Sequence, residues 1–327
     1  METRQLGRSH HIVGVVGLGA WQIGADWGNV DEDEALAVIG AAVDAGVTLV
    51  DTADVYGDGR SERLIGRYLR EHPGHGLTVA TKLGRRMPPV LANFTAANLR
   101  AWTDRSRANL GVDTLDLVQL HCPETAVYSD DAVFDALDAL VADKTIGAYG
   151  VSVETCAEAL TAIARPGVAS VQIVLNALRQ KPLDEVLPAA AEAGVAIIAR
   201  VPLASGLLSG KYDEHTTFAA DDHRNYNREG QAFDKGETFA GVPYDVGLAA
   251  VRELKDVVPA AETIAQLALR WIIDQPGVTV VIPGARNVSQ AQGNASAASV
   301  APLTDDQLAT VREVYDRLVR PHVHHLW

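Results

Sequence analysis

The feature that most constrains the fold of this chain is a regular alternation of short apolar runs with longer stretches of helical period. The apolar runs are rich in Val, Ile and Leu and occupy residues 15–19, 48–51, 77–82, 115–121, 146–152, 170–176, 195–200 and 278–283. Near-continuous apolar strands separated by amphipathic helices are typical of a parallel sheet covered by helices. Helices are predicted over 31–46, which opens with acidic residues and ends at a glycine, and over 95–111. This pattern predicts an α/β fold of the (β/α)8 TIM-barrel type.

An open, doubly wound sheet is the alternative, and it requires a GxGxxG turn after the first strand. Here the corresponding turn reads "GLGAWQIG", with glycines at 17, 19 and 24. The third glycine is therefore not at the position that the GxGxxG pattern requires, and no predicted helix begins directly after the turn. The opening residues "RQLGRSHHIVGV" predict a small N-terminal β-hairpin that closes one end of the barrel. The polar segment 211–245, after the seventh strand, lacks the periodicity of a helix or a strand. It is predicted to be either a lid over the strands' C-terminal ends or a simple surface loop. Because no linker or repeat is visible, residues 1–327 are expected to form a single domain.

Charge and cysteine content exclude several classes of protein. A formal net charge of −14 argues against sequence-independent nucleic-acid binding, which needs a basic surface. No apolar run approaches the roughly 18 residues of a membrane span. The start "METRQLGRSHH" lacks the apolar segment of a signal peptide, and Cys122 and Cys156 form no CxxC pair. We therefore expect a cytoplasmic protein with no nucleic-acid or membrane partner.

Polar residues stand at the ends of the predicted strands, which meet at one face of a barrel. The set comprises Asp51, Lys82, His121, Ser152, Gln172 with Asn176, Arg200 and the loop after Pro283, with Tyr56 following Asp51 in the next loop. Together they suit a carbonyl that accepts a hydride and must also receive a proton. Tyr56 can supply that proton if a neighbouring ammonium, Lys82 anchored by Asp51, lowers its pKa. His121 can then orient the carbonyl oxygen.

Each of these residues also has a structural interpretation. Asp51 can cap a loop, or form an ordinary ion pair with Lys82. Tyr56 can be a half-buried ring that serves only for packing. His121 can serve only to hydrogen-bond the backbone. Finding all of them at the same end of the barrel favours the catalytic interpretation.

The sequence resembles the aldo-keto reductase family. The resemblance rests on "DTADVYGDGRSERLIG" from residue 51, "ATK" at 80–82, "LVQLH" at 117–121, "GVS" at 150–152, "PLASGLLSGK" at 202–211 and "IPGARN" at 282–287. The branch it resembles includes inositol-type bacterial reductases and potassium-channel beta subunits. The resemblance implies a (β/α)8 barrel that binds an extended nicotinamide dinucleotide. It also implies that Asp51, Tyr56, Lys82 and His121 are the catalytic tetrad, with Tyr56 as general acid or base.

The same resemblance implies the cofactor contacts. Asp51, Ser152, Gln172 and Asn176 match positions around the nicotinamide, and Gly19 and Trp21 match the cofactor and substrate mouth. The pyrophosphate loop corresponds to Pro202, Leu203, Ser205, Gly206 and Lys211, and the adenosine end to Gly284, Arg286, Gln290 and Asn294. Because Arg286 suits a 2′-phosphate, NADPH/NADP⁺ is the expected cofactor, with NADH as the other option. The expected chemistry requires no metal.

Two positions depart from the family pattern. Val153 stands where many relatives have Asn, so the nicotinamide carboxamide has one contact fewer. Arg200 stands where relatives often stack an aromatic ring, and its planar guanidinium can stack as well. A cation beside the ring disfavours the oxidised, positively charged form, so NADP⁺ is expected to bind more weakly than NADPH.

The expected function is reduction of an aldehyde or ketone by an NADP-dependent oxidoreductase. The alternatives are a cofactor-bound regulatory subunit with little turnover and a sugar or inositol dehydrogenase that works in the oxidative direction. The expected partner is a small carbonyl or alcohol compound. The walls of its pocket are expected to come from Trp21, Trp27, Tyr56 and the 211–245 segment. A homo-oligomer is possible. The tail "RPHVHHLW" is expected to be frayed, although its histidines have metal-ligand character.

Overall fold

The computed structural model describes residues 1–24 and 30–327, and its centre is a ring of parallel strands. Neighbouring barrel strands are hydrogen-bonded in the order β10-β9-β8-β7-β6-β5-β4-β3. Parallel bridges between Val16 and Val281 and between Gly19 and Gly284 join the last strand to the first and close the barrel. The barrel strands are β3 Leu18–Gly19, β4 Leu49–Asp51, β5 Thr78–Leu83, β6 Leu115–His121, β7 Ile146–Ser152, β8 Val168–Val174, β9 Ala196–Arg200 and β10 Val278–Val281. The predicted TIM barrel is confirmed, and the doubly wound alternative is wrong.

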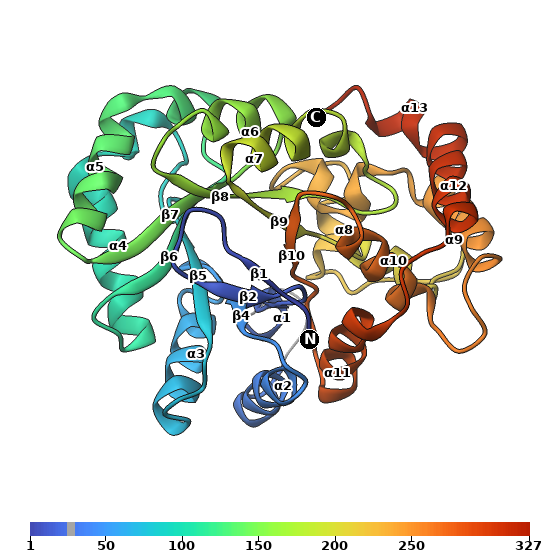
Figure 1. The fold of residues 1–327 in the computed structure, drawn as a ribbon, viewed down its shortest axis with the longest axis horizontal. Helices are drawn as coiled ribbons and strands as arrows, with labels where there is room; N and C mark the ends of the chain where they lie inside the picture. The colour runs from blue at the N-terminus through green and yellow to red at the C-terminus, as the bar shows by residue number, and fades with distance from the viewer. Residues whose placement is uncertain (25–29) are drawn as a thin grey trace.

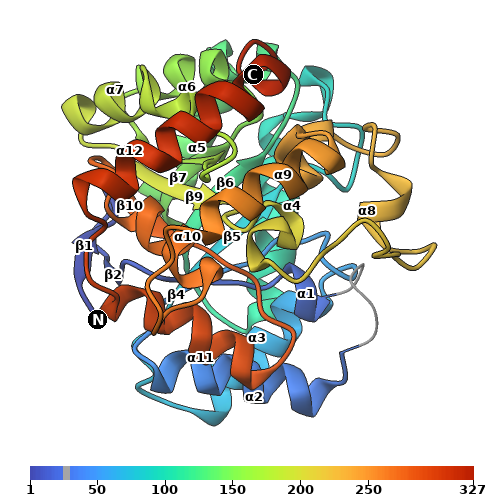
Figure 2. The ribbon, with the colours of Figure 1, turned by 90° about the vertical axis from the view of Figure 1, so that its right-hand side faces the viewer.

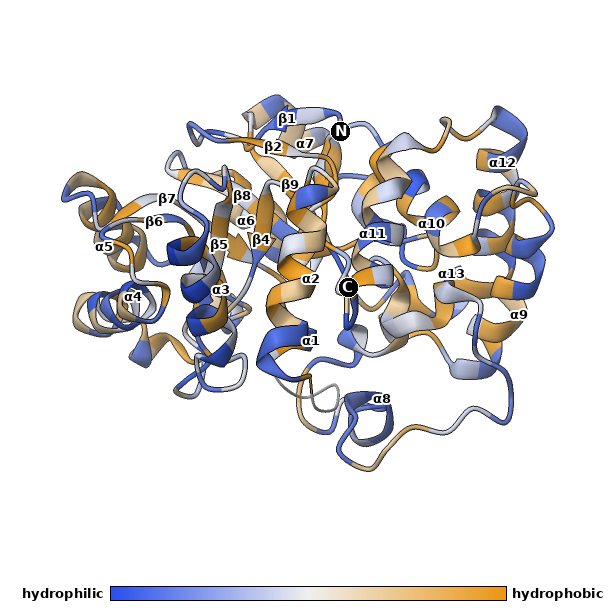
Figure 3. Cartoon of the chain, turned by 90° about the horizontal axis from the view of Figure 1, so that it is seen from below, coloured by the Kyte–Doolittle hydropathy of each residue, from blue (hydrophilic) through white to orange (hydrophobic). Residues whose placement is uncertain are grey.

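Helices surround the strands, as Figures 1 and 2 show from two directions. Helix α11 packs beside α2, so the last unit of the ring contacts the first. Figure 3 colours β4 and β9 largely orange, because they are buried on both faces, whereas α3 carries a broad blue side. The helices are α1 Trp21–Gly24, α2 Glu32–Asp44, α3 Arg60–Glu71, α4 Ala96–Leu110, α5 Asp131–Ala142, α6 Cys156–Ile163, α7 Val186–Ala193, α8 His223–Tyr226, α9 Tyr244–Lys255, α10 Ile264–Ile273, α11 Val288–Ser296, α12 Asp305–Val314 and α13 Arg320–Val323. Among the described residues, no helix combines the length and apolar character needed to cross a membrane.

Local chemistry explains where the two predicted helices begin and end. The Asp31 carboxylate accepts a hydrogen bond from the backbone N–H of Glu34 at 2.7 Å and caps α2. Thr95 caps the start of α4 in the same way, and Gly111 ends it in the left-handed conformation with φ +70°. Helix α2 is three residues shorter than predicted and α4 is two residues shorter, because the capping residues themselves lie outside the helices.

The N-terminal hairpin closes the end of the barrel opposite the strand C-termini. Its strands, β1 Thr3–Gln5 and β2 Ile12–Gly14, pair antiparallel as expected. Leu6 and Val13 are fully buried against the inward-facing residues of the barrel strands. At Gly7, with φ +54°, a Cβ atom would lie 1.9 Å from the carbonyl oxygen of Ala169, so only glycine allows this approach. The opposite end of the barrel is left for the polar strand ends.

The 211–245 segment and the C-terminal tail both fold onto the barrel. The segment contains α8 and two short 3₁₀ turns, Lys235–Glu237 and Phe239–Gly241, and α8 lies at the edge of the molecule in Figure 2. The expectation of a frayed tail is wrong: Trp327 is only 8% exposed, and its indole N–H donates to Asp234 Oδ1 of the segment at 3.0 Å. The tail is therefore docked against the segment, which the sequence pattern could not show.

Candidate active site

Three residues at or just beyond the ends of the neighbouring strands β4 and β5 form one hydrogen-bonded chain. The Lys82 ammonium donates to Asp51 Oδ2 at 2.6 Å, to the Thr52 carbonyl oxygen at 2.9 Å and to the Tyr56 hydroxyl at 3.2 Å. Lys82 is 1% exposed and Asp51 is 4% exposed, so little water screens the pair. The structure thus brings together three of the four residues predicted to form the catalytic tetrad.

The Asp51 carboxylate is held from the other side by two amides. Its Oδ1 accepts from the Gln172 side chain at 2.7 Å and from the Gln119 side chain at 3.3 Å. These glutamines lie on β8 and β6 and point into the barrel, where both are buried. Both carboxylate oxygens are therefore occupied, which keeps Asp51 in place to anchor Lys82.

Tyr56 is held in the turn between β4 and α3. Gly57 has φ +58°, and a Cβ atom there would lie 2.3 Å from the Gly24 carbonyl oxygen, so the sharp turn after the tyrosine needs glycine. The Tyr56 ring stacks on Trp21 with 6.0 Å between ring centroids, and it meets His121 edge-on, also at 6.0 Å. His121, the last residue of β6, thereby joins the other three residues.

The surroundings set the protonation of these groups. Burial raises the pKa of Tyr56, and the Lys82 ammonium opposes this without overcoming it. The predicted net lowering of the Tyr56 pKa is therefore wrong, because burial outweighs the cation. Burial acting alone would lower the pKa of Lys82, but Coulombic attraction to Asp51 and Tyr56 holds it above its usual value. Burial, with the charges of Arg85, Lys82 and Arg200, holds the pKa of His121 well below its usual range. At neutral pH the site thus has a neutral phenol, an ammonium and a neutral imidazole.

A long pocket of about 550 Å³ opens beside Tyr56, within the size range of small-molecule sites. Most of the residues predicted to bind the cofactor line it: Gly19, Trp21, Asp51, Gln172, Arg200, Pro202, Leu203, Ser205, Gly206, Lys211, Gly284, Arg286, Gln290 and Asn294. Trp27, the other predicted wall residue, lies outside the described residues.

Ser152 and Asn176 are not among the residues that line the pocket. The Ser152 hydroxyl accepts from the Cys122 thiol at 3.3 Å. The Asn176 amide donates to the Val201 carbonyl oxygen and accepts from the Leu178 N–H, each at 2.9 Å. Both side chains are buried and bonded within the protein, so direct contact of either with a cofactor stays a prediction.

The pocket fits a nicotinamide dinucleotide in three respects. Gly206 places no side chain on the pocket lining, so a ligand can come close to its backbone. Lys211 and Arg286 are exposed cations on its lining and suit phosphate. Gln22 Oε1 and Arg200 Nε are buried and have no hydrogen-bond partner among the described residues. A ligand with its own donors and acceptors, such as a carboxamide, matches these atoms.

The aldo/keto reductase family model matches residues 15–316, nearly the whole chain. This protein is a member of the aldo/keto reductase family. It is 32% identical over 279 residues to aldo-keto reductase YhdN of Bacillus subtilis, covering 84% of this chain and 82% of that protein. It is 28% identical over 325 residues to a probable voltage-gated potassium channel subunit beta of Arabidopsis thaliana, covering 93% of each.

Solved structures show the same architecture. A glycerol dehydrogenase, AKR11B4 from Gluconobacter oxydans, superimposes with a TM-score of 0.78 at 30% identity, covering 98% of this chain and 96% of that one. An aldo-keto reductase from Klebsiella pneumoniae in complex with NADPH gives a TM-score of 0.70 at 22% identity, covering 96% of each chain. At that identity the second likeness shows the fold alone. The chain is thus an oxidoreductase of this family by sequence and by architecture.

Four charged residues of this aldo/keto reductase form a ring beside the tetrad, and only Arg200 was singled out from the sequence. The other members are Arg85, Glu154 and Glu237. Arg85 and Glu154 each lie two residues beyond a strand end, and Glu237 lies in the 211–245 segment. Extending the search a few residues past each strand end would have found the first two. Nothing in the sequence marks Glu237 among the other acidic residues of its segment.

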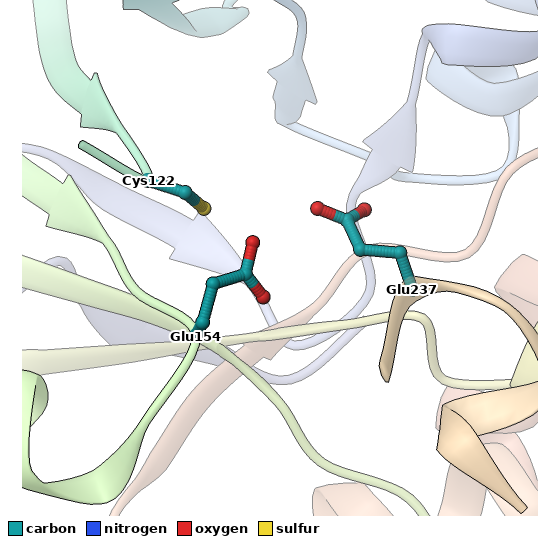
Figure 4. A group of neighbouring side chains, drawn as sticks. All are labelled: Cys122, Glu154 and Glu237. Carbon is teal, nitrogen blue, oxygen red and sulfur yellow. The ribbon is translucent and has the colours of Figure 1, made fainter. Parts of the chain in front are cut away.

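Cys122, Glu154 and Glu237 point toward a common centre, as Figure 4 shows, and their ligand atoms lie within 4.8 Å of one another. That spacing could hold a cation. However, both carboxylates are already ion-paired with arginines, and burial raises the pKa of the Cys122 thiol to about 12, so it stays protonated. The group is therefore part of an ion-pair network, and a metal would have to displace guanidinium groups to bind there.

Proposed function

We propose that this aldo/keto reductase reduces an aldehyde or ketone to an alcohol, with NADPH as the hydride source. The observation that carries the proposal is the buried chain from Asp51 through Lys82 to Tyr56, which ends beside His121 at the wall of the long pocket. A phenol, an ammonium and a neutral imidazole next to a dinucleotide-sized pocket suit proton delivery to a carbonyl oxygen.

Each residue of the tetrad has a separate task in this mechanism. A reduced nicotinamide supplies the hydride when it is bound. Tyr56 is protonated at neutral pH, because burial raises its pKa, and it donates the proton to the carbonyl oxygen. Lys82 stabilises the phenolate that this step leaves, and Asp51 keeps Lys82 charged. His121, held neutral, donates a hydrogen bond that orients the carbonyl oxygen.

We infer that the pocket residues hold the dinucleotide with its phosphates near Lys211 and Arg286, and that Arg286 favours NADPH over NADH. The expected discrimination against NADP⁺ needs revision. The charge of Arg200 is offset by Glu154 at 2.8 Å and Glu237 at 3.1 Å, so we expect NADP⁺ and NADPH to differ little in affinity.

Two further functions have some support. Similarity to a potassium-channel subunit suggests a regulatory protein with little turnover, although a non-enzymatic protein has no need of the orienting His121. Similarity to a glycerol dehydrogenase suggests the oxidative direction on a small alcohol, which the same residues would catalyse in reverse.

The test is oxidation of NADPH by an aromatic aldehyde, followed by the loss of NADPH absorbance. Turnover should fall at least about a hundredfold in Tyr56→Phe, because the proton donor is removed. Tyr68→Phe, a buried tyrosine on α3 away from the pocket, is the matched control and should keep full activity. Replacing NADPH by NADH should raise the cofactor KM. Tight NADPH binding without turnover of aldehydes, ketones or sugars would instead support the regulatory function.

A further inference from the structure

The ring of four charged side chains beside the tetrad is closed on three sides and open on the fourth. Arg85 Nη2 lies 3.2 Å from Glu154 Oε1, and Glu154 Oε2 lies 2.8 Å from Arg200 Nη2. Arg200 Nη1 lies 3.1 Å from Glu237 Oε2. The remaining pair, Arg85 Nη1 and Glu237 Oε1, is 3.7 Å apart. That separation exceeds the usual N–H···O range of about 2.7–3.2 Å, so these two atoms retain capacity for another partner.

The open link of the ring faces the reacting groups. A small cavity of about 170 Å³ is lined by Trp21, Val55, Tyr56, Arg85, His121, Phe233 and Glu237. Arg85 and Glu237 are the only ring members among these described lining residues, and they share the cavity with the proton donor and the orienting imidazole. A molecule whose carbonyl meets Tyr56 therefore has the open link within the same small space.

A hydroxyl group matches the open link because it combines a donor with an acceptor. It can donate to the Glu237 carboxylate and accept from the Arg85 guanidinium at the same time. An anionic group is less suitable, because two arginines and two glutamates give the ring a formal charge of zero. The neighbouring Cys122 thiol, with its pKa raised to about 12, adds no charge. A carboxylate here would lose its hydration, meet Glu237 and gain no net attraction.

We propose that Arg85 and Glu237 determine specificity, and that they select small uncharged carbonyl compounds with a hydroxyl group next to the carbonyl. The inference rests on the proposed reductase function and names its substrate class. The opposite wall is aromatic: Trp21 and Phe233 meet edge-on with 6.0 Å between ring centroids and restrict the cavity to short chains.

Packing around the 211–245 segment holds Glu237 in place. Trp327 bonds to Asp234 and lies over the Arg179 guanidinium at 3.8 Å from the ring centroid. At Gly236, next to Glu237, a Cβ atom would lie 2.1 Å from Arg179 Nη1, so the segment is pressed against the barrel. The Glu237 carboxylate is therefore held in position before the substrate binds, which reduces the conformational entropy lost on binding.

The experiment compares propanal, 2-hydroxypropanal and glyoxylate as substrates of the full-length protein with NADPH. Wild type should prefer 2-hydroxypropanal to propanal by roughly tenfold or more in kcat/KM, because propanal leaves two charged groups without their partner. Glu237→Gln should remove that preference and improve glyoxylate relative to both aldehydes, since the ring becomes positive. Glu229→Gln is the matched control, because Glu229 lies in the same segment, is exposed and pairs with Lys235 at 2.6 Å.

A second variant separates recognition from folding. Arg85→Lys keeps the ring neutral but loses the forked donor, so it should lose the hydroxyl preference while glyoxylate stays a poor substrate. Equal loss of activity on propanal and 2-hydroxypropanal in both variants would overturn the proposal and leave these residues a purely structural role. Wild type that reduces both aldehydes equally well would also overturn it, with the reductase function intact. Absence of turnover with every aldehyde would contradict the reductase function itself.

Discussion

Replacing Asp54 by Asn should stabilise this protein at alkaline pH. Asp54 lies in the turn after β4, where its N–H donates to the Lys82 carbonyl oxygen at 3.0 Å. It is fully buried, and neither carboxylate oxygen has a hydrogen-bond partner among the described residues. Burial, and then repulsion from Glu62, raises the pKa of Asp54 from 3.8 to about 7, although Arg86 and Arg105 oppose the change.

The sign and size of the effect follow from this difference in pKa. Between pH 3.8 and about 7 the folded protein holds a proton on Asp54 that the unfolded chain has released. The free energy of unfolding therefore falls as pH rises through this window. Above about pH 8 the full difference applies and corresponds to about 4 kcal/mol. Asn fills nearly the same volume and has no charge to bury, so the variant escapes this loss.

Urea unfolding of wild type and Asp54→Asn at a series of pH values measures the effect. The variant should gain stability over wild type as pH rises from about 4 to about 8, with little difference at the acid end. Asp113→Asn, which changes an exposed aspartate, controls for the loss of a surface charge. A stability difference that is independent of pH, or that shrinks as pH rises, would refute the assignment of a costly buried carboxylate to Asp54.

Two further predictions concern the tetrad and the tail. Lys82→Met should destabilise the protein by about 3–5 kcal/mol and abolish turnover, because it leaves Asp51 charged and buried without its cation. The double variant Asp51→Asn/Lys82→Met should recover most of the stability in urea unfolding but no activity, and a double variant as unstable as the single would contradict the account. Deleting Trp327 should raise the KM for 2-hydroxypropanal several-fold with little change in kcat for propanal, because the stack on Arg179 is lost. Trp327→Phe should restore that KM, and a loss of kcat shared equally by both aldehydes would show a general structural role instead.

The meeting of the four predicted tetrad residues could be expected from the sequence because barrel strands bring their C-terminal ends to one face. Asp51, Lys82 and His121 each lie within a residue of the end of a strand, and Tyr56 follows in a turn marked by glycine. The strand-end rule needs only local periodicity, so it succeeded without knowledge of packing. It says less about Ser152, whose contact with a cofactor stays a prediction, since the direction of a side chain at a strand end depends on its neighbours.

The ring of charges escaped prediction for a different reason. Arg85 and Glu237 are far apart in the chain and meet only because the 211–245 segment folds back over the barrel. The docking of Trp327 depends on the same fold-back. Neither contact has a periodic signal, because both are made by irregular backbone whose path is set by the surface beneath it.

The sequence by itself determined the order of strands and helices, the closed parallel sheet, the family and the residues that we propose for proton transfer. These follow from periodicity, capping and turn residues, which act over a few positions along the chain. Only the tertiary structure decided how those groups are charged and what lies beside them. The pKa of Tyr56 is raised although Lys82 is adjacent, and Arg200 is neutralised by carboxylates from two other segments. Burial and Coulombic interactions are sums over everything nearby in space, so they exist only once distant parts of the chain have come together.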